Sequence, residues 1–217
     1  MATQKNELMQ LKILECAKVL FKEYGYTKTS IRMICKEIGF RNQASFYMYF
    51  TSKEELASRI MQEYFRKVEK FISNVGGSNK NALVILLLRE LIGCQVQKDP
   101  VQRRFFTEFQ QTQTLRSMSE QVPEFVNLID EKVQAFSSKL SIEEMRVYMF
   151  YYISGFSSVL RSIDNQESKV TADEVIDELP SIFLELLKID YELRQNIIDR
   201  AKELFSSISD KDYINIL

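Results

Sequence analysis

The chain has 217 residues, of which 45% are hydrophobic and 27% are charged; this favours one or two compact domains and excludes a disordered or fibrous chain. With only 6 glycines and 3 prolines, the many tight turns of a β-sandwich or barrel are disfavoured, and an all-α fold is predicted. The sequence contains no histidine, which excludes His-dependent nucleophilic catalysis and His-containing metal sites. We therefore expect no metal and no cofactor.

The three cysteines, Cys16, Cys35 and Cys94, are widely spaced without a Cys-x-x-Cys pair, which favours buried free thiols over a disulfide framework or a metal cluster. The longest apolar run, residues 82–88, is far shorter than the roughly 20 residues that cross a bilayer. No basic segment followed by an apolar stretch opens the sequence, so no signal peptide and no membrane association are predicted. The expected location is the cytoplasm.

The first 75 residues show the periodicity of four helices. Thr29 or Ser30 is the predicted N-cap of the second helix, and Gly39 is its C-terminal stop. Ser52 and Glu55 have the spacing of a capping box at the start of the fourth helix. The predicted helices cover about residues 5–24, 30–38, 44–50 and 52–75.

The rest of the chain also shows helical periodicity, and no strand alternation is found. Pro180 falls inside one predicted helix, where it deletes the hydrogen bond to the Ile176 carbonyl and is expected to kink or interrupt the helix. The predicted helices cover residues 80–97, 100–112, 120–140, 142–164, 172–188 and 190–207.

Charge is distributed unevenly along the sequence. Residues 1–53 contain nine Lys and Arg against four Glu, a net charge of +5, which leaves −6 of the total −1 for residues 54–217. A basic segment attached to an acidic body is typical of a protein in which one small region attracts phosphates. A chance imbalance among solvated helix faces is the alternative, and charge alone does not decide between them.

Two short helices joined by a Gly-containing turn are typical of a helix-turn-helix, whose second helix presents its first side chains to the major groove. The sequences ILECAKVLFKEYGYTKTSIRMICKEIGF and FYMYFTSKEEL, within residues 8–60, resemble the TetR family of bacterial transcription regulators. The resemblance implies a helix-turn-helix domain over residues 1–53 and a helical ligand-binding and dimerisation domain over residues 54–217. It also implies that the protein is not an enzyme.

Tyr47 follows Gly39 by eight residues, one more than is usual in the family, so two registers of the recognition helix stay open. Residues 43–45 or residues 41–42 lead the helix. Arg41 suits guanine, and Asn42 or Gln43 suits adenine. Other residues match positions that fix phosphates in the family or add positive charge. The candidate DNA contacts are Lys28, Thr29, Ser30, Arg32, Arg41, Asn42, Gln43, Ala44, Ser45, Tyr47, Tyr49 and Lys53.

Aromatic and amide side chains in residues 105–113 predict the wall of a pocket for an apolar or aromatic ligand, with Glu90 or Glu108 as the anchor for a cationic group. Ordinary core packing is the alternative for each of them. The candidate ligand contacts are Glu90, Phe105, Phe106, Phe109, Gln110, Gln113, Phe125, Ile129 and Tyr151.

Apolar stripes along residues 142–164 and 172–188 fit either an intramolecular core or the seam of a homodimer, and the resemblance favours the seam. The candidate interface residues are Tyr148, Tyr152, Phe156, Val159, Ile163, Leu179 and Phe183.

The resemblance implies a transcriptional repressor that binds a palindromic double-stranded DNA operator as a homodimer and is released by a small apolar or aromatic effector. One alternative is a DNA-binding adaptor that a protein partner controls, without a small-molecule pocket. The other is an all-helical enzyme, for which the sequence shows no metal cluster, Gly-rich phosphate loop or nucleophile constellation.

Overall fold

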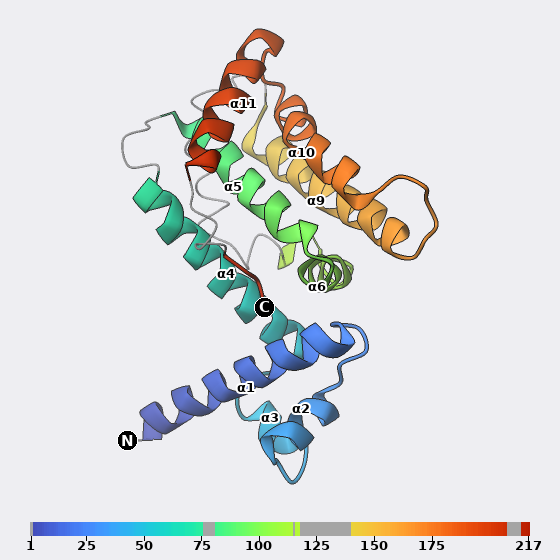
Figure 1. The fold of residues 1–217 in the computed structure, drawn as a ribbon. Coiled ribbons are helices and arrows are strands. Elements are labelled where there is room, and N and C mark those ends of the chain that lie inside the picture. Colours follow the sequence, from blue (N-terminus) through green and yellow to red (C-terminus); the bar gives the residue numbers. More distant parts are fainter. Residues whose placement is uncertain (1, 76–80, 115, 118–139, 208–213) are drawn as a thin grey trace.

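The computed structural model describes residues 2–75, 81–114, 116–117, 140–207 and 214–217, and the regular elements of these parts are all helices (Figure 1). The predicted all-α fold is confirmed. The helix predicted over residues 120–140 lies outside the described residues, apart from Leu140. The helices are α1 (Ala2–Tyr24), α2 (Ile31–Ile38), α3 (Ala44–Tyr47), α4 (Lys53–Val75), α5 (Ala82–Lys98), α6 (Pro100–Gln110), α9 (Ile142–Asp164), α10 (Ala172–Leu186) and α11 (Tyr191–Ser206).

The helices form a small head and a larger body (Figure 1). Helices α1, α2 and α3 make up the head, and α4 runs from the head along the body. In the body, α5 packs against α10 and α11, while α6 packs on α9 and also reaches α1. Helix α6, like α4, therefore contacts the first helix of the head.

Local sequence signals set the starts of α9 and α10. Ser141 and Glu144 form a complete capping box at the start of α9, and Thr171 and Glu174 form another at the start of α10. In each box a side-chain oxygen accepts a backbone N–H that has no partner within the helix. These starts agree with the predicted boundaries.

Helix α10 runs unbroken through Pro180, so the predicted interruption does not occur. Proline removes only its own hydrogen bond, to the Ile176 carbonyl. Ile176, Leu179, Pro180 and Phe183 are all buried, and α10 packs on both α5 and α9. Burial of this apolar face outweighs the loss of one hydrogen bond.

The cysteines are free thiols, with Cys35 and Cys94 buried and Cys16 partly exposed. Within the described parts of the chain, no group of three His, Cys, Asp or Glu residues has the arrangement of a metal site. Among the same residues, no helix has the length and apolar character needed to cross a membrane.

Candidate nucleic-acid interface

Helix α2 has a well-defined start and end. Ser30 is its N-cap, with an extended backbone and a side-chain oxygen that accepts the Met33 N–H at 3.2 Å. Gly39 ends the helix with φ of +85°, a left-handed conformation that favours glycine. Beyond it, the Phe40 N–H donates to the Cys35 carbonyl at 2.8 Å and closes the turn. The direction of the chain into the second short helix is thus fixed by residues that the sequence already singled out.

The start of α3 distinguishes the two possible registers geometrically. The Asn42 side-chain oxygen accepts the Ser45 N–H at 3.2 Å, while Gln43 at the N-cap makes no side-chain capping bond. Arg41 and Asn42 therefore lie in the turn before the helix, and Ala44 is its first residue. This placement corresponds to the register led by residues 43–45.

One side chain anchors α3, and its neighbours point outward. Phe46 is fully buried and contacts the Tyr47 and Phe50 rings at centroid distances of 5.6 and 5.9 Å. Tyr47 is 52% exposed and Met48 is 76% exposed. The sequence analysis did not single out Met48, because an apolar residue in a helical pattern is usually assigned to the core. Met48 is therefore an exposed apolar residue directly after α3.

The exposed surface of α2 and α3 is positively charged. Residues 27–50 contain four cationic side chains, Lys28, Arg32, Lys36 and Arg41, against the single acidic residue Glu37. All five are exposed. A net charge of +3 on this short stretch is concentrated where the two helices meet solvent.

Thr29 differs from its predicted role as an exposed phosphate contact. The side chain is 1% exposed, and its hydroxyl lies 2.7 Å from the Gly25 carbonyl and 3.2 Å from the Leu20 carbonyl. The hydroxyl therefore donates to the end of α1, whose last carbonyls have no partner within the helix. Thr29 fixes the turn between α1 and α2 and leaves the surface to Ser30.

Lys53 also has an internal role. Its ammonium group donates to the Tyr26 carbonyl at 2.9 Å and to the Thr29 carbonyl at 3.0 Å, and it lies 4.3 Å from the centre of the Tyr26 ring. Burial lowers the pKa of this ammonium, and the carboxylates of Glu54 and Glu108 partly oppose the shift. Lys53 thus ties the first residue of α4 to the turn that precedes α2. Tyr49, half-buried, stacks on Phe40 with a centroid distance of 6.2 Å.

Two of the predicted ligand contacts instead join the head to the body. Phe105 and Phe109 of α6 are fully buried. The Phe105 ring lies 5.3 Å from the Phe21 ring, and the Phe109 ring lies 5.6 Å from the Tyr26 ring. These aromatic side chains therefore form the contact between α6 and the end of α1.

Polar groups of α6 hold the same junction. The Thr27 N–H donates to the Glu108 carboxylate at 2.6 Å, so Glu108 is not free to anchor a ligand. The Arg104 guanidinium donates to the Lys22 carbonyl at 2.7 Å. Gly25 has φ of +82°, and a Cβ atom there would lie 3.0 Å from both Glu108 carboxylate oxygens. Glycine is thus required both by the backbone conformation and by the close approach of α6.

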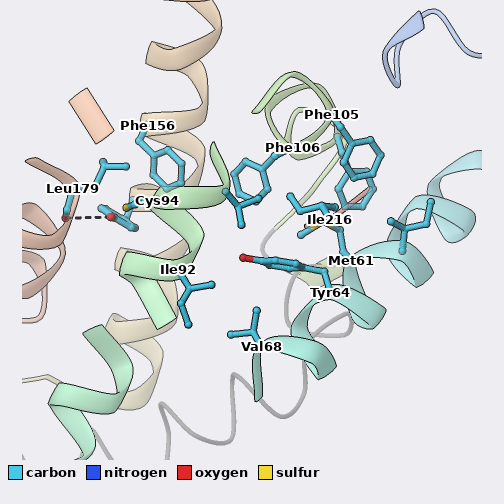
Figure 2. Packing of buried hydrophobic residues seen from close by; sticks show 14 of the residues in the cluster. Met61, Tyr64, Val68, Ile92, Cys94, Phe105, Phe106, Phe156, Leu179 and Ile216 are labelled. Carbon is cyan, nitrogen blue, oxygen red and sulfur yellow. Dashed lines mark hydrogen bonds between the residues drawn. The ribbon is translucent and has the colours of Figure 1, made fainter. Parts of the chain in front are cut away.

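Glu90 lies among aromatic side chains inside the body. Its carboxyl group accepts the Tyr152 hydroxyl at 2.5 Å and lies 3.7 Å from the Cys94 sulfur. Burial raises the pKa of Glu90, and the hydrogen bonds from Tyr152 and Cys94 partly oppose this shift. Phe106 is buried and stacks on Phe156 at 6.0 Å. Figure 2 shows that the phenol of Tyr64 on α4 points toward α5 in this region.

The other predicted ligand contacts are not brought together with Glu90. Tyr151 is 67% exposed on α9, so the structure does not place it in an enclosed pocket with Glu90. Gln110 and Gln113 are half-buried at the end of α6 and just beyond it. Phe125 and Ile129 lie outside the described residues.

Most of the predicted dimer contacts are buried within one chain. Tyr152, Phe156, Leu179 and Phe183 are at most 9% exposed, and the Tyr152 ring contacts the Phe156 and Phe183 rings. Their assignment to an interface is wrong, because this stripe faces the core. Tyr148 and Ile163 are half-buried, and Val159 is 48% exposed. The outer faces of α9 and α10 carry the exposed residues Val147, Tyr151, Gly155, Ser158, Val159 and Ile182.

The fold and this site define a helical protein with an N-terminal helix-turn-helix head. Residues 13–60 match the family described as "Bacterial regulatory proteins, tetR family". This match covers the helix-turn-helix head and the start of α4, less than a quarter of the chain. Over these residues the chain is similar to regulatory proteins.

Two proteins of Bacillus subtilis (strain 168) are similar to part of the chain. The uncharacterized HTH-type transcriptional regulator YfiR is 38% identical over 71 residues, which are 31% of this chain and 34% of YfiR. The uncharacterized HTH-type transcriptional regulator YuxN is 38% identical over 63 residues, which are 29% of this chain and 21% of YuxN. The similarity thus spans about a third or less of either relative.

Most of the fold is similar to that of a solved protein, the fatty acid degradation regulator FadR from Bacillus halodurans. The two structures superpose with a TM-score of 0.54 and 19% identity, covering 82% of this chain and 94% of FadR. At this identity the similarity establishes a shared fold.

Proposed function

We propose that the protein is a TetR-like repressor that binds a palindromic DNA operator as a homodimer and is released by a small-molecule effector. Residues 1–53 bind DNA in this proposal, and residues 54–217 bind the effector and form the dimer. Helix α4 begins at Lys53 and connects the two parts.

The observation that carries the proposal is the surface of α2 and α3. Helix α2 and the turns on either side of it carry four exposed cationic side chains, and α3, which is too short to be stable alone, is anchored by the buried Phe46. Such a helix, held against the rest of the head, suits insertion into the major groove. The cations bind phosphates and set orientation, and the exposed polar side chains read the base edges.

The first residues of α3 are the proposed base contacts. Gln43, Ala44 and Tyr47 are exposed, and Ser45 is half-buried beside the Asn42 cap. Gln43 can pair with adenine, and Ala44 can contact a thymine methyl group. In the preceding turn, the amide nitrogen of Asn42 stays available as a donor because its oxygen caps the helix.

The direct test is a gel-shift titration of the wild-type protein on the DNA upstream of its own coding sequence at several salt concentrations. If a dimer neutralises about eight phosphates, affinity falls by about 10³-fold or more between 50 and 200 mM salt. A scrambled DNA of equal length is the control. Binding of both DNAs with equal affinity, or of neither, would contradict the proposal.

The outer face of α9 and α10 is the proposed dimer interface, in place of the buried stripe. Among the described residues outside its own stretch of helix, no atom lies within 4 Å of where a Cβ on Gly155 would be, so this part of α9 is open to close approach by another helix. Val147, Tyr151, Val159 and Ile182 supply exposed apolar area around it. A two-fold axis through such a face gives a self-complementary contact and pairs the two heads.

The interface has a test that needs no DNA. Val159→Glu with Ile182→Glu places two charges in each copy of the face, so we expect dimers to dissociate to monomers at micromolar concentration in sedimentation velocity. Leu193→Glu on α11 is the matched control, because Leu193 is 56% exposed and lies on neither helix of the proposed interface. A double variant that remains dimeric would refute this interface.

The effector site is proposed around Glu90 and Phe106. These residues combine a partly enclosed carboxyl group with aromatic walls from α4, α6 and α9, which supports a small apolar or aromatic molecule with a polar group. Binding there favours one position of α6, and α6 contacts the end of α1. The effector binds more tightly when α6 is in the position that orients the head wrongly for the operator. Its binding therefore lowers the affinity of the protein for DNA.

A further inference from the structure

Residues 214–217 lie against the body without belonging to a helix. Ile216 is 3% exposed, and Ile214 and Leu217 pack against the core around it. Figure 1 shows this segment running along α4, and Figure 2 shows Ile216 beside Met61 and Tyr64 of that helix. A segment far from α4 in sequence thus inserts a side chain beside that helix.

Gln102 of α6 holds this segment by its backbone. Its side-chain oxygen accepts the Ile216 N–H at 3.0 Å and the Leu217 N–H at 2.9 Å. Gln102 is 5% exposed, so both hydrogen bonds are shielded from water. One amide oxygen therefore uses both of its lone pairs on two successive residues of the segment.

Three consecutive residues of α6 hold three different parts of the molecule. Gln102 holds residues 214–217, Arg103 pairs with Asp164 of α9 at 2.8 Å, and Arg104 donates to the last turn of α1. Successive helix residues point about 100° apart, so these contacts surround α6. These three contacts together set the position of α6, so loss of any one of them allows the helix to shift.

We infer that residues 214–217 act as an intramolecular latch that holds α4 and α6 together and thereby orients the head for DNA binding. The latch is Ile216 in the core together with the two N–H groups on Gln102. Its effect on DNA affinity rests on the proposed function, but its effect on the head does not. When the latch is released, α6 loosens its hold on the end of α1, and the head loses the orientation in which it binds.

The latch is built to be reversible. Its described contacts are one buried side chain, two partly buried side chains and two hydrogen bonds, with no helix to stabilise it. Segments held this lightly open more readily than packed helices do. The open and latched forms therefore exchange without unfolding of the body.

The test compares three single variants of the full chain by hydrogen exchange and melting. Gln102→Leu removes the accepting oxygen, and Gln102→Glu keeps one. Gln95→Leu is the control, because Gln95 is half-buried on α5 and makes no side-chain hydrogen bond among the described residues. In Gln102→Leu we expect exchange to become about tenfold faster at the amides of Ile216, Leu217 and Thr27. Gln102→Glu and Gln95→Leu keep the wild-type rates.

Thr27 is the decisive amide, because its N–H donates to Glu108 at the junction of α6 with the head. Faster exchange at Ile216 and Leu217 without a change at Thr27 would refute the coupling. Unchanged exchange at all three would refute the latch. If Gln102→Leu lacks a cooperative melting transition, the chain lacking residues 214–217 takes its place in the same measurements, with the same expectations.

Two further measurements separate the latch from the proposed function. A fluorescent peptide of residues 208–217 binds the chain lacking residues 214–217 and does not bind the wild-type chain, whose site is filled; binding to neither would overturn the latch. On DNA that the wild type binds, Gln102→Leu weakens binding by about fivefold or more, within the usual range of coupling between sites. Wild-type affinity in that variant would refute coupling to DNA binding. Failure of the wild type itself to bind DNA would refute the proposed function alone.

Discussion

Replacing Arg41, Gln43 and Tyr47 together with alanine is expected to raise the Kd for the operator by at least about 100-fold. Each contact with a base or phosphate contributes about 1 to 3 kcal/mol, so even three weak contacts give this loss. The three side chains are exposed, and their removal leaves the Phe46 anchor and the Asn42 cap in place. The melting temperature should therefore stay close to that of the wild type, and the loss should appear in gel-shift titrations alone.

The chain offers a control that removes the same three residue types. Tyr191, Gln195 and Arg200 are exposed on α11, at the far end of the body from the head (Figure 1). Their joint replacement with alanine changes the net charge equally and should leave operator affinity within about twofold of wild type. Equal effects of the two triple variants would mean that α3 does not read the operator.

The single variants then distinguish the roles of these residues. If Arg41 binds a phosphate from the turn, Arg41→Ala weakens binding to all DNA sequences and lowers the salt slope by about one per contact. Loss of Gln43 instead relaxes the preference at one base pair. Measuring the affinity of both variants for a set of mutated operators shows which residue is the first to contact a base.

Phe105→Ala is expected to lower the free energy of unfolding by about 3 to 5 kcal/mol, because it empties a fully buried position. The ring lies among Phe21, Tyr26 and Phe109, and its loss separates α6 from the head. Urea unfolding measures the loss of stability. Hydrogen exchange in the turn between α1 and α2 should become faster, since that turn loses the helix that covers it.

Phe106→Ala is the matched comparison. Phe106 is the next residue, is 9% exposed and stacks on Phe156 within the body. Phe106→Ala should also destabilise the protein, but hydrogen exchange in the turn between α1 and α2 should not become faster. If Phe105→Ala costs less than about 1 kcal/mol, or if both variants loosen the turn equally, Phe105 does not join the head to the body.

The helix-turn-helix could be predicted from sequence because its boundaries are local. Ser30 and Gly39 act within a few residues of themselves, through a capping bond and a positive φ. The roles of Thr29 and Lys53 could not be predicted in this way. Their partners are carbonyls at the end of α1 and in the turn after it, which only the folded head brings within reach.

The effector pocket and the dimer interface could not be predicted from sequence, because their prediction depends on which helices pack against each other. Tyr151 and Tyr152 are adjacent in sequence, yet one is 67% exposed and the other 4% exposed, because α10 covers one side of α9. Periodicity identifies an apolar stripe but not the element that covers it. Phe105 and Phe109 were assigned to a ligand for the same reason, since nothing near them in sequence indicates their contact with Phe21 and Tyr26.

The arrangement of Gln102, Arg103 and Arg104 limits how α6 can change. Inserting one residue ahead of Gln102 within the helix would turn these side chains by about 100°, and each would face the partner of its neighbour. The chain can therefore tolerate changes of length after the end of α6 more easily than within it. The register of an 11-residue helix fixes, in one step, how three distant parts of the protein are joined.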